Sequence, residues 1–121
     1  MSKTILLVDD TETVLLFEKI MLKGSGFALR AAHNGNEAIE DIKRVKPDLI
    51  LLDILMPEMD GIQTCRQIKG DPETSAIPII MVTTKGDQEL VDLAVQAGCN
   101  DYMTKPLDKV ELLTKVRAFL G

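Results

Sequence analysis

The sequence contains only two cysteines, Cys65 and Cys99, and one histidine. The cysteines show no CxxC pattern and no Cys/His spacing, so neither a disulfide framework nor a zinc site is expected. We predict that both thiols are reduced and pack as small apolar side chains.

The sequence has no long apolar run, and the first run covers only residues 5–8. Nothing resembles the apolar region of a signal peptide or a membrane span, and we expect a cytoplasmic protein without membrane contact. The net charge is -5, and the sequence has no tryptophan and no basic run. These features remove the usual electrostatic footprint of a protein that binds phosphate backbones, so direct binding of nucleic acid is not expected.

A length of 121 residues with 45% hydrophobic content allows one ordinary core, so residues 1–121 are predicted to form one domain. Three apolar runs, at residues 5–8, 49–52 and 79–82, lack alternation and are typical of parallel strands covered on both faces. Weaker strand candidates lie at residues 27–32 and 99–103 and suit the edges of the sheet.

Stretches with helical spacing separate these strands. Their apolar positions are Val14, Phe17 and Met21; Ala38, Ile39 and Ile42; Ile62, Cys65 and Ile68; Leu90, Ala94 and Ala97; and Leu113, Val116 and Leu120. The predicted C-terminal caps are Gly24, Gly70, Gly98 and Gly121. Asp108 and Glu111 are spaced to cap the start of the last helix. The alternation predicts an α/β fold in which a parallel sheet carries helices on both faces.

Reactive polar residues follow most of the predicted strands. They are Asp9 and Asp10 after the first strand, Asp53 after the third, Thr83 after the fourth and Lys105 just beyond the fifth. An isolated aspartate after a strand is more often a turn or a helix cap. Because ligands of an open α/β sheet bind at the carboxyl ends of its strands, however, the combination predicts one shared site.

The chemistry of this predicted site follows from its charges. Three neighbouring carboxylates raise one another's pKa, and a cation relieves their repulsion. Because only oxygen ligands are available, the set favours Mg²⁺, completed by water and phosphate oxygens. Lys105 can neutralise phosphoryl charge, Thr83 can donate a hydrogen bond to a phosphoryl oxygen, and Asp53 can act as the nucleophile.

Several short motifs stand out along the chain: Val8-Asp9-Asp10, the run DILMPEMDG that begins at Asp53, Thr83-Thr84 and Lys105-Pro106. In residue type and spacing they resemble the receiver domain of bacterial two-component response regulators. The resemblance covers essentially the whole chain and is most similar in extent to the stand-alone chemotaxis-type regulators. It implies a single flavodoxin-like (βα)5 domain with a five-stranded parallel sheet in the order 2-1-3-4-5.

The resemblance assigns a role to each residue of the predicted site. It implies that Asp53 is the phosphoacceptor and that Asp10, Asp53 and the backbone carbonyl of Leu55 bind Mg²⁺. Asp9 would act through a metal-bound water, and Lys105 would bind the phosphoryl group. The phosphodonor would be a sensor histidine kinase or a phosphotransfer protein.

The resemblance also implies a conformational switch. The hydroxyl of Thr83 would move toward the phosphate, and the ring of Tyr102 would turn inward. A downstream protein would bind the face formed by the fourth helix, the fifth strand and the fifth helix. The Lys105-Pro106 peptide bond would be cis, and Gly61 would serve the turn into the third helix.

Leu55, Thr84 and Lys85 depart from the pattern of the fastest-turning members of this family. Those members tend to carry polar or acidic groups at positions 55 and 85, and alanine or glycine at position 84. The departures affect the expected rate of dephosphorylation. Leu55 offers an attacking water no hydrogen bond, which favours a long-lived phosphorylated state.

Other classes of protein remain open at this point. A Mg²⁺-dependent phosphatase or phosphotransferase would need a general acid or base two residues after its nucleophile, where Leu55 stands. A flavin-binding module would need a phosphate loop after the first strand, where the sequence has Asp9-Asp10-Thr11-Glu12. A degenerate receiver would lack part of the site, which is complete here. We therefore predict a switch that catalyses its own aspartyl phosphorylation and dephosphorylation, and not a conventional enzyme.

Overall fold

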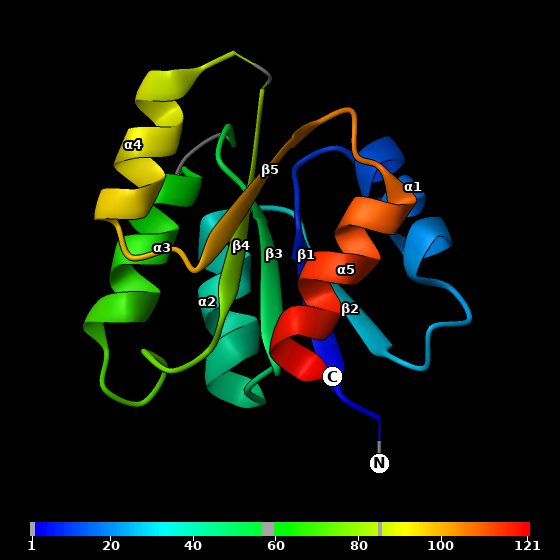
Figure 1. The fold of residues 1–121 in the computed structure, drawn as a ribbon. Coiled ribbons are helices and arrows are strands. Elements are labelled where there is room, and N and C mark those ends of the chain that lie inside the picture. Colours follow the sequence, from blue (N-terminus) through cyan, green and yellow to red (C-terminus); the bar gives the residue numbers. More distant parts are fainter. Residues whose placement is uncertain (1, 57–59, 85) are drawn as a thin grey trace.

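The computed structural model describes residues 2–56, 60–84 and 86–121, which form alternating strands and helices (Figure 1). The strands are β1 (Thr4–Val8), β2 (Ala28–Ala32), β3 (Leu49–Asp53), β4 (Ile79–Thr84) and β5 (Asp101–Lys105). The helices are α1 (Glu12–Leu22), α2 (Gly35–Arg44), α3 (Gly61–Gly70), α4 (Gln88–Gln96) and α5 (Lys109–Leu120). Neighbouring strands are parallel in the order β2-β1-β3-β4-β5, which confirms the predicted flavodoxin-like fold.

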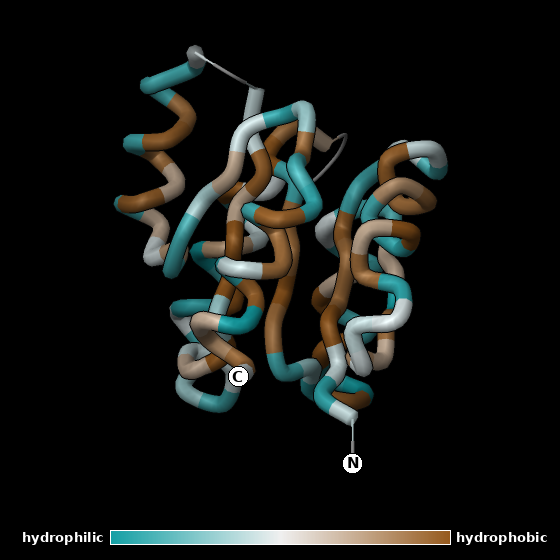
Figure 2. The backbone as a smooth tube through the Cα atoms, turned by 45° about the vertical axis from the view of Figure 1, so that its right-hand side comes forward, coloured by the Kyte–Doolittle hydropathy of each residue, from teal (hydrophilic) through white to brown (hydrophobic). Residues whose placement is uncertain are grey.

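The helices form a layer on each face of the sheet, with α1 and α5 on one face and α2, α3 and α4 on the other (Figure 1). Side chains of β1 alternate between the layers: Ile5 and Leu7 pack with α1 and α5, whereas Leu6 and Val8 pack with the other helices. Because both faces are covered, every apolar position of the central strands is buried. Figure 2 shows these strands as continuous hydrophobic segments between the helices.

The two edge strands are less buried, as their weaker apolar content predicted. In β2 only Ala32 is buried, and in β5 only Met103. β5 begins at Asp101, two residues after the predicted start at Cys99. The reason is the end of α4: the Cys99 amide donates to the Ala94 carbonyl oxygen, and Gly98 has a φ of 98°. This geometry completes a Schellman cap, so Cys99 belongs to the helix end and not to the strand.

The buried face of α1 differs from the predicted one. The spacing of Val14, Phe17 and Met21 predicted the core-facing side, but α1 instead buries Leu15, Glu18 and Leu22, and Phe17 is 56% exposed. Most positions of α1 are apolar, so several faces satisfy helical spacing equally well. The buried face contains a glutamate, so apolar periodicity alone does not identify it.

Helix ends follow the expected chemistry with two exceptions. The Asp108 side chain accepts a hydrogen bond from the Glu111 amide, as its spacing predicted. Gly70 is the last residue of α3 and not a cap, because Asp71 occupies the cap position. A full capping box joins Asp60 and Gln63 at the start of α3, a pair that was not predicted.

No helix within the described ranges is both long enough and apolar enough to cross a membrane.

Candidate functional site

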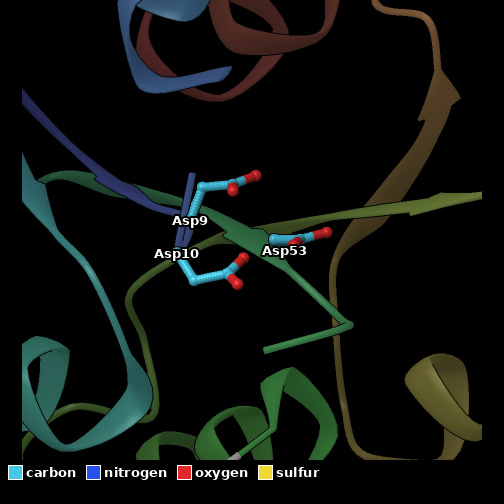
Figure 3. A group of neighbouring side chains, drawn as sticks. All are labelled: Asp9, Asp10 and Asp53. Atoms are coloured by element: carbon cyan, nitrogen blue, oxygen red, sulfur yellow. The ribbon is translucent and has the colours of Figure 1, made fainter. Parts of the chain in front are cut away.

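The predicted acidic residues meet at the carboxyl edge of the sheet, where β1 and β3 lie side by side. Asp9 and Asp10 follow β1, and Asp53 is the last residue of β3. Each of these residues offers one carboxylate oxygen, and these oxygens lie within 4.8 Å of one another (Figure 3). This edge is the topological switch point of the sheet, because the chain leaves β1 on one side toward β2 and on the other side β1 pairs with β3.

Strand alternation explains how the site is arranged. Asp9 continues the alternation of Ile5 and Leu7, and Asp53 that of Leu49 and Leu51, so both lie on the side of the sheet that α1 and α5 cover. Asp9 is fully buried and Asp53 is 4% exposed, whereas Asp10 is exposed. The cluster therefore has two buried carboxyl groups and one that is exposed to solvent.

Lys105, the last residue of β5, supplies the positive charge of the site. Its Nζ atom lies 3.4 Å from Asp53 Oδ1 and 3.7 Å from Asp9 Oδ2, and its side chain is 36% exposed. Burial alone would lower the pKa of Lys105, but the charges of Asp53 and Asp9 outweigh it and raise the pKa. Lys105 is therefore charged at neutral pH and bridges the two buried carboxyl groups. The peptide bond that follows it, Lys105-Pro106, is cis.

Burial and mutual repulsion raise the pKa values of the buried acids. Burial, followed by the charge of Asp9, raises the pKa of Asp53 from 3.8 to about 6, although Lys105 acts in the opposite direction. Burial is also the main reason that the pKa of Asp9 is raised. Without a further cation these carboxyl groups are thus destabilised in their ionised forms.

The cluster fits a hard divalent cation. Oδ2 of Asp9 is buried and has no hydrogen-bond partner among the described residues, so an acceptor is left unfilled. The available ligands are carboxylate oxygens without nitrogen or sulfur, the set that suits Mg²⁺. Asp9, Asp10 and Asp53 are the residues that would hold the ion.

Thr83 approaches the site from the end of β4. It is 1% exposed, and its Oγ1 has no hydrogen-bond partner among the described residues. A buried hydroxyl without a partner is costly to maintain, so it is available to a ligand that enters the site. Tyr102, the residue expected to act with Thr83, is 40% exposed on β5.

Two of the other predicted positions are exposed. Leu55 is 57% exposed, and Thr84 is exposed at the end of β4. Lys85 lies outside the described residues. The structure therefore exposes the Leu55 and Thr84 side chains to solvent.

Gly61 has a different role from the predicted turn. It is the first residue of α3, its amide donates to the Ile54 carbonyl oxygen at 2.8 Å, and its φ does not lie in the left-handed region. A side chain at this position would collide with the backbone of Asp53 and Ile54. Glycine is present because α3 starts in close contact with the backbone at the end of β3.

Sequence reasoning missed one member of the site, Glu18 of α1. Its side chain is 1% exposed, and its Oε1 atom has no hydrogen-bond partner among the described residues. Burial is the main reason that its pKa rises from 4.5 to about 8, and the charges of Asp9 and Asp53 add to the shift. The signal in the sequence is a single acid between Leu15 and Leu22, which share its helical face.

The structure thus has a five-stranded parallel sheet with three acids, a lysine and a threonine at the carboxyl ends of its strands. A family model for the response regulator receiver domain matches residues 5–117. The chain belongs to this family, and it is a receiver domain of a two-component response regulator.

Relatives in this family differ in length. The chain is 40% identical over 117 residues to Protein PilH of Pseudomonas aeruginosa, covering 97% of both proteins. It is 38% identical over 120 residues to the DNA-binding response regulator MtrA of Mycobacterium tuberculosis, covering 99% of this chain and 51% of MtrA. The chain thus spans about half the length of the MtrA-type relatives and nearly all of PilH.

Solved structures agree with the fold. The signal receiver domain of a signal transduction histidine kinase from Syntrophus aciditrophicus has a TM-score of 0.92 at 37% identity, covering 98% of this chain and 90% of that one. The chemotaxis protein CheY4 of Vibrio cholerae has a TM-score of 0.91 at 24% identity, covering 98% of this chain and 99% of that one, and supports the fold alone.

Proposed function

We propose that this receiver is a cytoplasmic, phosphorylation-dependent switch, which accepts a phosphoryl group on Asp53 in the presence of Mg²⁺ and then changes its affinity for a downstream protein. The observation that carries the proposal is the position of Asp53. Its carboxylate lies within 4.8 Å of those of Asp9 and Asp10, and 3.4 Å from the Lys105 ammonium. A nucleophile, a set of oxygen ligands and a positively charged side chain are the parts that phosphoryl transfer needs.

The phosphodonor would be a histidine kinase or a phosphotransfer protein. A carboxylate oxygen of Asp53 attacks the phosphorus, and the bond between phosphorus and the donor imidazole nitrogen breaks with its electron pair staying on the imidazole. Mg²⁺ held by Asp10, Asp53 and the Leu55 backbone carbonyl, and by Asp9 through a bound water, would supply charge neutralisation for the carboxylates and the phosphoryl oxygens. Lys105 adds a second positive charge, and the free hydroxyl of Thr83 can donate to a phosphoryl oxygen.

The signal would leave the site through β4 and β5, which are paired in the sheet. Movement of Thr83 toward the phosphoryl group would free space for Tyr102 to turn inward from its 40% exposed position. The face formed by α4, β5 and α5 would then present a different surface to a downstream protein. The longer relative MtrA is named as a DNA-binding response regulator. For the receiver itself we propose a protein partner.

Two other readings of the same fold are less well supported. A phosphatase would need an acid or base at position 55, where an exposed leucine stands at the rim. A flavin site would need a phosphate-binding loop after β1, where Asp9 and Asp10 would instead repel a phosphate.

The proposal is tested by phosphorylation with a small acyl phosphate, followed by measurement of the intact mass. We expect the wild type to gain one phosphoryl group with Mg²⁺ and none after chelation. Asp53→Ala should gain none, whereas Asp92→Asn, which alters an exposed acid of α4, should behave as the wild type. Labelling that persists in Asp53→Ala, or that does not need a divalent cation, would contradict the proposed site.

A further inference from the structure

A groove of about 330 Å³ lies beside the acidic cluster, between α1 and the segment that follows β5. Its apolar lining consists of Val14, Phe17, Met21, Pro106 and Leu107. Among the described residues that line it, Glu18 and Lys105 are the charged ones. The groove therefore brings one acid and the site's lysine together in an otherwise apolar wall.

Packing alone does not explain a glutamate at position 18. It lies on the core-facing side of α1, where its neighbours Leu15 and Leu22 are buried apolar residues. A buried carboxyl group with an unfilled oxygen costs stability that a leucine at this position would not. Because Glu18 is costly to bury and lies next to the acidic cluster, we look for its role in that site.

Lys105 is the residue on which Glu18 can act. Its ammonium lies 3.4 Å from Asp53 Oδ1 and 3.7 Å from Asp9 Oδ2 and neutralises part of their charge. The same carboxylates would hold Mg²⁺, so the metal and the ammonium compete for the same oxygens and repel each other. Until a phosphoryl group arrives, the displaced ammonium needs another anion.

Glu18 is placed to be that anion. Asp9, Asp53 and Lys105 are on the side of the sheet that α1 covers, and Glu18 is on the face of α1 that is directed toward the sheet. The Lys105 side chain lines both the acidic site and the groove, and it is 36% exposed, so it has room to move. Approach of an ammonium also favours the ionised form of a carboxyl group.

We propose that Glu18 is a positioning residue for Lys105: its carboxylate receives the ammonium when a divalent cation occupies the cluster of Asp9, Asp10 and Asp53, and later releases it to the phosphoryl group. The inference rests on the proposed function of this cluster. The groove would then affect Mg²⁺ binding, because it would hold the Lys105 ammonium while the ion occupies the carboxylates.

The test is a double-mutant cycle on Mg²⁺ affinity, measured by calorimetric titration of the full chain. With Lys105 present, Glu18→Gln should weaken Mg²⁺ binding roughly five-fold, the scale of one ion pair. In a Lys105→Met background the same substitution should have no effect, because no ammonium needs a second position. Glu18→Leu should repeat both results, and Glu40→Gln, an exposed acid on α2, should leave the affinity unchanged.

Equal weakening in both backgrounds would mean that Glu18 acts on the metal directly through its charge, and would overturn the proposal. The absence of any weakening with Lys105 present would overturn it too. Nuclear Overhauser contacts between the Lys105 and Glu18 side chains should strengthen at saturating Mg²⁺, and unchanged contacts would count against it.

Failure of this inference is distinguishable from failure of the proposed function. If only the Glu18 proposal is wrong, the wild type still takes one phosphoryl group from an acyl phosphate with Mg²⁺. If the site itself is wrong, that labelling fails in the wild type.

Discussion

Gly61 lies against the backbone of Asp53 so closely that a Cβ atom at position 61 would be 2.2 Å from the Asp53 carbonyl oxygen and 2.7 Å from the Ile54 Cα. The atoms in the way belong to the main chain, which cannot rotate aside as a side chain can. The start of α3 and the end of β3 are thereby held in close contact, and the position of Asp53 depends on a residue without a side chain.

Gly61→Ala should therefore disturb both stability and phosphorylation. We expect a loss of about 2 kcal/mol in the free energy of unfolding, the usual size of an overpacking defect, together with slower labelling of Asp53. Gly70→Ala is the matched control, because it lies in the same helix and a Cβ there meets nothing within 4 Å. Denaturant unfolding measures the difference, and equal stability of the two variants would contradict the close contact.

Stability of the metal-free protein should fall as the pH rises through the acidic and neutral range. The folded-state pKa values of Asp53 and Glu18 are raised, to about 6 and about 8, so the folded protein retains protons that the unfolded chain has already lost. Their favourable contribution is present at low pH and is lost between the ordinary and the raised pKa values.

Glu18→Gln should flatten the upper part of this curve, between about pH 6 and pH 8, because the raised pKa of Glu18 leaves this buried acid protonated there while it is already ionised in the unfolded chain. Each pKa unit corresponds to about 1.4 kcal/mol, so the effect is large enough to measure by denaturant unfolding at several pH values. The exposed Glu40→Gln is the control. Parallel curves for wild type and Glu18→Gln would show that the pKa of Glu18 is not raised in the folded protein.

Mg²⁺ should raise the melting temperature, because the folded protein gathers three carboxylates that are dispersed in the unfolded chain. At a concentration 100-fold above its dissociation constant the ion should add about 2.7 kcal/mol to stability. Asp10→Asn should weaken this response, and it should also raise the stability of the metal-free protein, because the charge of Asp10 repels Asp9 and Asp53. A melting temperature indifferent to Mg²⁺ would contradict the metal site.

Much of this site could be predicted from sequence because strand ends are easy to locate. Apolar runs stop at Val8 and Val82, and the polar residues that follow them must lie at one edge of a parallel sheet. Glu18 could not be found in this way, because its placement depends on which of several apolar faces α1 buries. Gly61 was identified, but the close approach to Asp53 is a property of tertiary packing that local turn chemistry does not contain.

Thr83 and Tyr102 should be coupled in the phosphorylated protein. We expect Thr83→Ala to accept a phosphoryl group, since Asp53 and the acids remain, but to lose the inward movement of the Tyr102 ring. Amide and ring chemical shifts of Tyr102 before and after phosphorylation measure the effect. Thr104→Ala is the control, because Thr104 is a threonine on the neighbouring strand β5, in register with Thr83. Identical Tyr102 responses in wild type and Thr83→Ala would exclude this route.

The phosphorylated state should be long-lived because of the residue at the rim of the site. Hydrolysis needs a water placed in line behind the phosphorus, and Leu55, which is 57% exposed, offers that water no hydrogen bond. Leu55→Asn should accelerate loss of the phosphoryl group, and the double variant Leu55→Asn, Lys85→Glu should do so by roughly ten-fold, equivalent to about 1.4 kcal/mol of barrier. Val110→Asn, an equally polar change at a 73% exposed position of α5, should leave the decay unchanged.

In the measurement the protein is first phosphorylated, the donor is then removed, and the phosphorylated mass is followed over time. Decay of both variants at the wild-type rate would show that neither Leu55 nor Lys85 slows dephosphorylation. If Leu55→Asn alone gives the full acceleration, the slow dephosphorylation is due to the leucine.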